Sequence, residues 1–96
     1  MNQGCAVALA GCRVLVVEDE AMIAMDMANL LGAMGAEVVG PVPSVREALG
    51  LITDPGTGID RAVLDINLRG EPGFAVADAL AARAIPFVFA TGYDAQ

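Results

Sequence analysis

The fold is decided by the stretch Asp60-Arg-Ala-Val-Leu-Asp-Ile-Asn67, in which an apolar run is followed directly by the carboxylate of Asp65. Asp60 to Leu64 predicts a buried strand, since short apolar runs are typical of strands covered on both faces of a parallel sheet. Asp65 then stands where this strand ends. Open parallel sheets bind ligands beyond the carboxyl ends of their strands, so Asp65 is the first candidate for a functional residue.

A second predicted strand is likewise followed by acidic residues. Cys12 to Val17 is a near-continuous apolar run that leads into Glu18 and Asp19. If both strands belong to one parallel sheet, Glu18, Asp19 and Asp65 meet at the same edge. Carboxylates held this close raise one another's pKa unless a cation neutralises them. An all-oxygen ligand set suits Mg²⁺, so the sequence predicts a magnesium site at this edge.

The rest of the chain alternates helices with strands. Apolar periodicity and stop signals predict helices over Glu20 to Met34, Ser44 to about Thr53 and Phe74 to Arg83, and further strands over Ala36 to Val39 and Ile85 to Ala90. Ser44 and Glu47 have the spacing of a capping box. Asn67 to Gly73 is expected to be a loop, with Pro72 at a first helical turn. This alternation predicts right-handed βαβ crossovers and an α/β fold with a doubly wound parallel sheet.

Three polar motifs follow three of the predicted strands: Glu18-Asp19, Asp65-x-Asn67 and Thr91-Gly92. Each motif alone is also typical of a turn or of a helix start. In this order and spacing, the set resembles the receiver domain of two-component response regulators. Pro86-Phe-Val-Phe-Ala-Thr-Gly-Tyr93 also resembles a signature of single-domain receivers of alphaproteobacteria. The resemblance spans the chain from Arg13 to Tyr93.

The resemblance implies a flavodoxin-like sheet with the strand order 2-1-3-4-5, of which this sequence supplies four strands and three helices. By this comparison one βα unit of about thirty residues, with the fifth strand and the last helices, is missing at the carboxyl end, so either the sequence is a fragment or the protein is an unusual short form. We therefore expect a flexible leader over residues 1–11. A receiver domain should cover residues 12–96, truncated after the fourth strand, with the order 2-1-3-4.

The resemblance also implies roles for the acidic cluster. Asp65 is the implied phosphoacceptor and, with Asp19, a ligand of Mg²⁺. Glu18 is implied to hold a coordinated water, and the backbone carbonyl of Asn67 to complete the protein's share of the ligands.

The phosphoryl group has its own implied contacts. Thr91 would donate a hydrogen bond to a phosphoryl oxygen, and Gly92 would let the group approach without a steric clash. The implied donor is a phosphohistidine on a histidine kinase or a histidine phosphotransfer protein. The chemistry of the chain itself is then at most weak self-phosphorylation and autodephosphorylation.

The sequence departs from the family in one way that bears on this chemistry. The family has a lysine on the fifth strand that contacts the phosphoryl group, and this chain contains no lysine. An alternative is therefore a receiver-like protein-interaction module with impaired phosphorylation. A third hypothesis is a phosphohydrolase with Asp65 as nucleophile. It is disfavoured because phosphatases of the haloacid-dehalogenase type need a second aspartate where Asn67 stands.

Composition excludes several classes of function. The net charge of −7 and the lack of a basic cluster argue against nucleic acid, because phosphate contacts need Lys and Arg. Cys5 and Cys12 have no metal-ligand spacing and there is no His, which predicts reduced thiols in a cytoplasmic protein. The apolar stretch from Cys5 to Gly11 is too short to span a membrane.

The last predicted strand has an unprotected edge. Phe87-Val-Phe-Ala90 carries no charge, and without a fifth strand this edge is a template for pairing with another chain. For a chain that ends at Gln96 we therefore expect a homodimer, or a higher homo-oligomer, with a two-fold dimer as the simplest closed solution.

Overall fold

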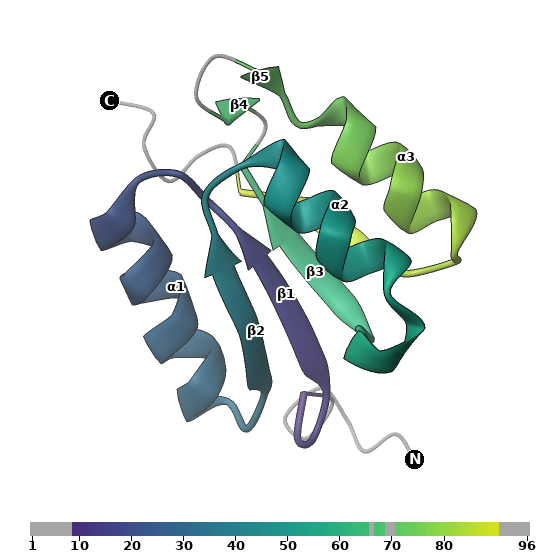
Figure 1. Ribbon diagram of the computed structural model, residues 1–96. Coiled ribbons are helices and arrows are strands. Elements are labelled where there is room, and N and C mark those ends of the chain that lie inside the picture. Colours follow the sequence, from purple (N-terminus) through teal and green to yellow (C-terminus); the bar gives the residue numbers. More distant parts are fainter. Residues whose placement is uncertain (1–8, 66, 69–70, 91–96) are drawn as a thin grey trace.

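The computed structural model of the chain describes residues 9–65, 67–68 and 71–90. Its main sheet holds four parallel strands in the order β2-β1-β3-β6 (Figure 1). These strands are β1 (Arg13–Val17), β2 (Glu37–Val42), β3 (Arg61–Leu64) and β6 (Phe87–Phe89). Since β6 is the fourth of these strands along the chain, the predicted order 2-1-3-4 is confirmed.

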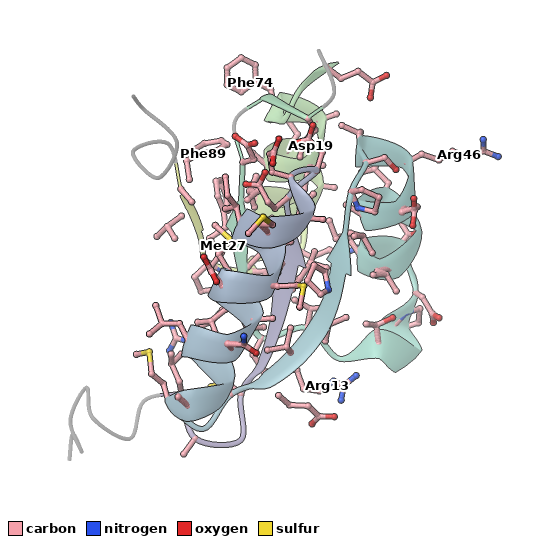
Figure 2. The ribbon with its side chains drawn as sticks, turned by 90° about the vertical axis from the view of Figure 1, so that its left-hand side faces the viewer. Arg13, Asp19, Met27, Arg46, Phe74 and Phe89 are labelled. Carbon is pink, nitrogen blue, oxygen red and sulfur yellow. The ribbon has the colours of Figure 1, made fainter. Side chains whose placement is uncertain are left out.

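Helices lie on both faces of the sheet (Figure 1 and Figure 2). α1 (Ala21–Ala33) contacts β1 and β2, whereas α2 (Val45–Thr53) and α3 (Phe74–Ala82) pack together on the other face. A short 3-10 helix, η2 (Pro55–Thr57), follows α2. This is the doubly wound, flavodoxin-like arrangement that the sequence predicts, with four strands and three α-helices. No helix in the described part of the chain is long and apolar enough to cross a membrane.

The hydrophobic core lies mainly between the sheet and the pair α2–α3. Successive side chains of a strand point to opposite faces, so Leu15 and Val17 face α2 and α3 while Val14 and Val16 face α1. The helices add buried side chains to the first of these faces: Ala48, Ile52, Val76 and Leu80. Burying one Val or Leu contributes about 1.5–3 kcal/mol, so this layer holds β1 and β3 in place.

β2 is longer than predicted, because Gly40 bends the strand without ending it. The prediction stops at Val39, whereas the strand continues to Val42. Gly40 has φ +96°, and a Cβ there would lie 2.8 Å from the Val42 nitrogen and 3.1 Å from the Val16 carbonyl oxygen. Only glycine fits this bend, which keeps the end of β2 in the sheet beside the end of β1.

The segment after β3 also differs from the prediction. Asn67 to Gly73 is not a plain loop, because β4 (Asn67–Leu68) and β5 (Glu71–Pro72) form a small antiparallel pair. The prediction that Pro72 lies in a first helical turn is wrong, since Pro72 belongs to β5 and α3 begins at Phe74. The fully buried Leu68 anchors this pair to the core.

α2 begins with the Ser44 half of the capping box that the sequence predicts. The Ser44 hydroxyl oxygen accepts a hydrogen bond from the Glu47 N–H at 3.2 Å. The same hydroxyl donates to the Glu47 carboxylate at 3.3 Å. One backbone N–H that would lack a partner at the start of the helix is thereby satisfied.

Ser44→Ala is therefore expected to lower the free energy of unfolding by about 1 kcal/mol. For a chain of this size the melting temperature should fall by about 4–8 °C, followed by circular dichroism. Thr53→Ala is the matched control, because its hydroxyl lies at the far end of α2 and donates to carbonyls of the same helix, Leu49 at 2.8 Å and Gly50 at 3.4 Å, and caps no N–H. Equal losses in the two variants would contradict a specific capping role.

Candidate functional site

The carboxyl ends of β1 and β3 lie side by side and are held by backbone hydrogen bonds. Val17 pairs with Leu64, and the Asp65 N–H donates to the Val17 carbonyl at 2.9 Å. The Glu18 N–H donates to the Val42 carbonyl at 3.0 Å. The sheet thus continues one residue beyond each strand, so the sheet itself fixes the backbone of Glu18 and Asp65.

Three carboxylates gather at this edge. Glu18, Asp19 and Asp65 each offer one oxygen, and these oxygens lie within 4.8 Å of one another. Glu18 is 4% exposed and Asp65 7%, whereas Asp19 is half-buried. Figure 2 shows Asp19 at one end of the sheet, just before the start of α1. The structure therefore brings together the three acids that the sequence places at two strand ends.

The electrostatics of the cluster favour a bound cation. The pKa of the Glu18 carboxyl is raised from 4.5 to about 7, chiefly by burial. The charge of Asp65, a hydrogen bond with Asp65 and the charge of Asp19 contribute to this rise, whereas the N–H of Glu20, which donates to Glu18 Oε2 at 2.9 Å, opposes it. A cation would remove this repulsion and return Glu18 to its ionised form.

The donor set fits a small hard cation. Carboxylate oxygens are the ligands that Mg²⁺ prefers, and it usually takes one or two of them and keeps several waters. The oxygens of an octahedral Mg²⁺ site stand roughly 3 to 4 Å apart, given metal–oxygen distances of about 2.1 Å. The spacing of up to 4.8 Å in this cluster allows two direct carboxylate ligands, with the third acid reached through a water.

The remaining predicted site residues are only partly described. Thr91 and Gly92 lie outside the described residues. Ala90 directly precedes them, and its N–H donates to the Leu64 carbonyl at 2.8 Å, so β6 ends beside Asp65 at the same edge. Asn67 lies in β4, two residues after Asp65.

Sequence reasoning missed the β4–β5 pair that follows Asp65. The available signal was Leu68, a single apolar residue among polar neighbours, which is fully buried. By anchoring β4 to the core, Leu68 fixes the path of the backbone as it leaves Asp65. The position of the Asn67 backbone is therefore set by a packed side chain one residue further on.

Comparison with known proteins identifies the family of the chain. The family model described as the response regulator receiver domain matches residues 14–96. The chain belongs to this family. It is a receiver domain of two-component systems. Its acidic cluster lies at the carboxyl ends of the neighbouring strands β1 and β3.

Solved structures and a relative of known name are similar to this receiver. SdrG from Sphingomonas melonis Fr1 is 48% identical, with a TM-score of 0.76 over 88% of this chain and 70% of that one. Its BeF3-activated conformation is 47% identical, with a TM-score of 0.69 over 83% and 67%. The response regulator PhyR from Brucella abortus is 30% identical, with a TM-score of 0.76 over 88% and 35%.

The relative is the transcriptional regulatory protein PdtaR of Mycobacterium tuberculosis. It is 34% identical over 85 residues, which are 85% of this chain and 40% of PdtaR. The chain thus spans less than half the length of PdtaR and about a third of PhyR. The activities of these longer proteins are therefore not assigned to this chain.

Proposed function

We propose that this receiver accepts a phosphoryl group on Asp65 from a phosphohistidine of a histidine kinase or a histidine phosphotransfer protein. Mg²⁺ is the proposed cofactor. The observation that carries the proposal is the convergence of Glu18, Asp19 and Asp65 within 4.8 Å at the ends of two adjacent strands. Membership of the receiver family supports the same reading.

Phosphoryl transfer depends on in-line positioning and on charge stabilisation. In the proposed step an Asp65 carboxylate oxygen forms a bond to phosphorus while the phosphorus–nitrogen bond of the phosphohistidine breaks. The electron pair of the broken bond returns to the imidazole nitrogen. Asp65 suits this role because its N–H is held by the Val17 carbonyl at 2.9 Å, so its side chain starts from a fixed backbone.

Bound Mg²⁺ would supply the positive charge that lets a phosphoryl donor approach three carboxylates. We assign Asp19 and Asp65 as direct ligands, as the resemblance to receiver domains implies. Glu18 is the most buried of the three and is assigned to a coordinated water. The backbone carbonyl of Asn67 is assigned as the last protein ligand.

Thr91 and Gly92 are the proposed phosphoryl-binding residues. The Ala90 N–H is bonded to the Leu64 carbonyl, so the chain leaves β6 beside Asp65. A hydroxyl in the next position could donate to a phosphoryl oxygen. A residue without a side chain after it would leave room for the group.

The proposed partners follow from this chemistry. A histidine kinase or a phosphotransfer protein supplies the phosphoryl group, which implies a cytoplasmic location. Direct binding of nucleic acid is not proposed, because a chain with a net charge of −7 repels phosphate backbones.

A second candidate function rests on the lack of lysine in all 96 residues. The chemistry of these 96 residues by themselves would then be at most weak self-phosphorylation and autodephosphorylation. The chain would then act as a receiver-like protein-interaction module. The two candidates differ in whether the site binds a phosphoryl group at all.

Beryllofluoride with Mg²⁺ separates the two candidates, because beryllofluoride mimics an aspartyl phosphate. A ligand at a hundredfold excess over its Kd adds about 2.7 kcal/mol to the free energy of unfolding. For a phosphoacceptor we expect a rise in melting temperature of roughly 10 °C, measured by circular dichroism. Mg²⁺ alone, beryllofluoride alone and Asp65→Asn with both are the controls, and each should show a smaller rise. No rise with the pair of ligands would favour the interaction module.

A further inference from the structure

The backbone that leaves Asp65 enters a small antiparallel pair of strands before it reaches α3. β4 begins two residues after Asp65, and Gly73 alone separates β5 from the start of α3 at Phe74. The pair therefore connects the acidic edge of the main sheet to the first turn of α3 (Figure 1). The placement of the backbone beside the acidic cluster depends on how this pair is held.

The register of the pair decides which backbone groups of Asn67 it uses. Asn67 stands opposite Pro72, and Leu68 stands opposite Glu71. Opposed residues of antiparallel strands either exchange two hydrogen bonds or exchange none, and the two kinds alternate. Pro72 has no N–H to donate, so Asn67 and Pro72 form the pair that exchanges none. The carbonyl of Asn67 therefore points away from β5 and is not taken up by the pairing.

Leu68 attaches this pair of strands to the rest of the domain. Its side chain is 0% exposed and belongs to the core cluster that also contains Leu64 and Val76, whereas Glu71 opposite is exposed. Successive side chains of a strand point to opposite faces, so burying Leu68 also fixes the rotation of β4 about its own axis. The direction of the Asn67 carbonyl is thereby set by the packing of the next side chain.

We propose that Leu68 is a positioning residue for the cation site and makes this site select Mg²⁺ over Ca²⁺. The inference rests on the proposed function, in which the Asn67 carbonyl is a ligand beside Asp19 and Asp65. Leu68 contributes no ligand atom. It acts through the backbone of its neighbour, whose carbonyl it holds at one position of the coordination shell.

The two cations differ in how strictly they require this position. Mg²⁺ needs nearly ideal octahedral geometry at about 2.0–2.1 Å, whereas Ca²⁺ accepts flexible geometries at about 2.3–2.6 Å. The main sheet fixes the backbone of Asp65, whose N–H donates to the Val17 carbonyl at 2.9 Å. The Asn67 carbonyl has no such support from the main sheet and depends on Leu68. Loosening β4 therefore displaces one oxygen of the octahedron that Mg²⁺ requires, while Ca²⁺ adapts to the shift.

Leu68→Ala tests the inference with the two metals. The variant removes the side chain that anchors β4 and leaves every proposed ligand atom in the chain. We expect the Kd for Mg²⁺ to rise by about tenfold, the range found when the support of a metal ligand is removed. The Kd for Ca²⁺ should rise by less than about twofold, because its geometry is flexible. NMR titrations of the full 96-residue chain with each metal alone measure both constants.

Leu80→Ala is the matched control. Leu80 is also 0% exposed and lies in the same core cluster. It stands near the far end of α3, where its carbonyl accepts the Ile85 N–H at 2.9 Å. The two variants lose the same atoms from one core, so a general loss of packing would change metal binding equally in both. The ratio of the two Kd values should change by about fivefold in Leu68→Ala and stay at the wild-type value in Leu80→Ala.

Two milder variants cover the case in which circular dichroism shows Leu68→Ala to be unfolded. Leu68→Val keeps a smaller apolar side chain in the core and should raise the Kd for Mg²⁺ more than the Kd for Ca²⁺. Leu68→Met nearly conserves the volume of the side chain and should restore the wild-type ratio. This order of effects follows the anchoring of β4, since none of the variants changes a charge.

The carbonyl carbon of Asn67 provides a spectroscopic signature. Its chemical shift should move on saturation with Mg²⁺ in the wild type and in Leu80→Ala, and should move less in Leu68→Ala. An equal ratio of the two Kd values in folded Leu68 variants, Leu80→Ala and wild type would overturn the role of Leu68 and leave the proposed phosphoacceptor untouched. A wild-type chain that binds no Mg²⁺ would overturn the proposed cofactor and this inference together.

Discussion

Asp65→Asn is expected to abolish phosphorylation of this chain. Incubation with acetyl phosphate and Mg²⁺ should add one phosphoryl group to the wild type and none to the variant, measured by intact mass. The amide keeps the size of the side chain but has no carboxylate oxygen to form the acyl phosphate. It also removes one negative charge from a cluster whose oxygens lie within 4.8 Å of one another.

Asp54→Asn is the matched control for this loss. Asp54 is an exposed aspartate that caps η2 by accepting the Gly56 N–H at 2.9 Å, and it takes no part in the acidic cluster. This variant should be labelled as fully as the wild type. Labelling that persists in Asp65→Asn would assign the phosphoacceptor to another residue.

Asp19→Asn separates the metal ligand from the nucleophile. It should weaken Mg²⁺ binding by about tenfold or more, since a unit charge in direct contact with a divalent ion is lost. Labelling should recover at least partly at high Mg²⁺, because Asp65 is unchanged. Equal labelling of Asp19→Asn and wild type at limiting Mg²⁺ would show that Asp19 is not a ligand.

The sequence predicts the parts of the site that depend only on where each strand ends. Each of two apolar runs ends in an acid, and a parallel sheet brings such ends to one edge. Glu18, Asp19 and Asp65 therefore converge as expected. Thr91 and Gly92 follow the same rule, but they lie outside the described residues and stay predictions.

The parts that the sequence does not predict depend on contacts between distant segments. The run through Gly40 looks like a strand end, yet the strand continues, because neighbouring β1 keeps its end paired. Leu30 and Met34 share helical spacing with the buried Met27, but they are 64% and 47% exposed. Periodicity shows which residues share a face of a helix, and only the rest of the fold decides how far that face is covered.

The second large effect concerns pH and Mg²⁺ together. In the folded chain without metal, the pKa of Glu18 is about 7, above its ordinary value of 4.5, because the carboxyl is buried beside Asp65. Between these two values the folded state holds a proton that the unfolded state has released. The contribution of Glu18 to the free energy of unfolding is therefore largest below pH 4.5 and falls as the pH rises to about 7. The expected loss is on the order of 2 kcal/mol.

Mg²⁺ should reverse this loss, because its carboxylate ligands and the acid beside them must be ionised when it binds. Affinity for Mg²⁺ should therefore be about tenfold weaker at pH 6 than at its plateau above pH 7, with one proton released on binding. Titration calorimetry in buffers of different ionisation enthalpy measures both quantities. The rise in melting temperature on adding Mg²⁺ should likewise be larger at pH 8 than at pH 6.

Glu18→Gln tests whether protonation of Glu18 causes the pH dependence of stability and of Mg²⁺ affinity. Without the titrating carboxyl, the chain should lose the fall in stability between pH 4.5 and about 7 and should be more stable than the wild type at pH 8 without metal. Its affinity for Mg²⁺ should be weaker but nearly constant from pH 6 to pH 8. A Glu18→Gln variant that kept the pH dependence of the wild type would show that this proton is not bound by Glu18.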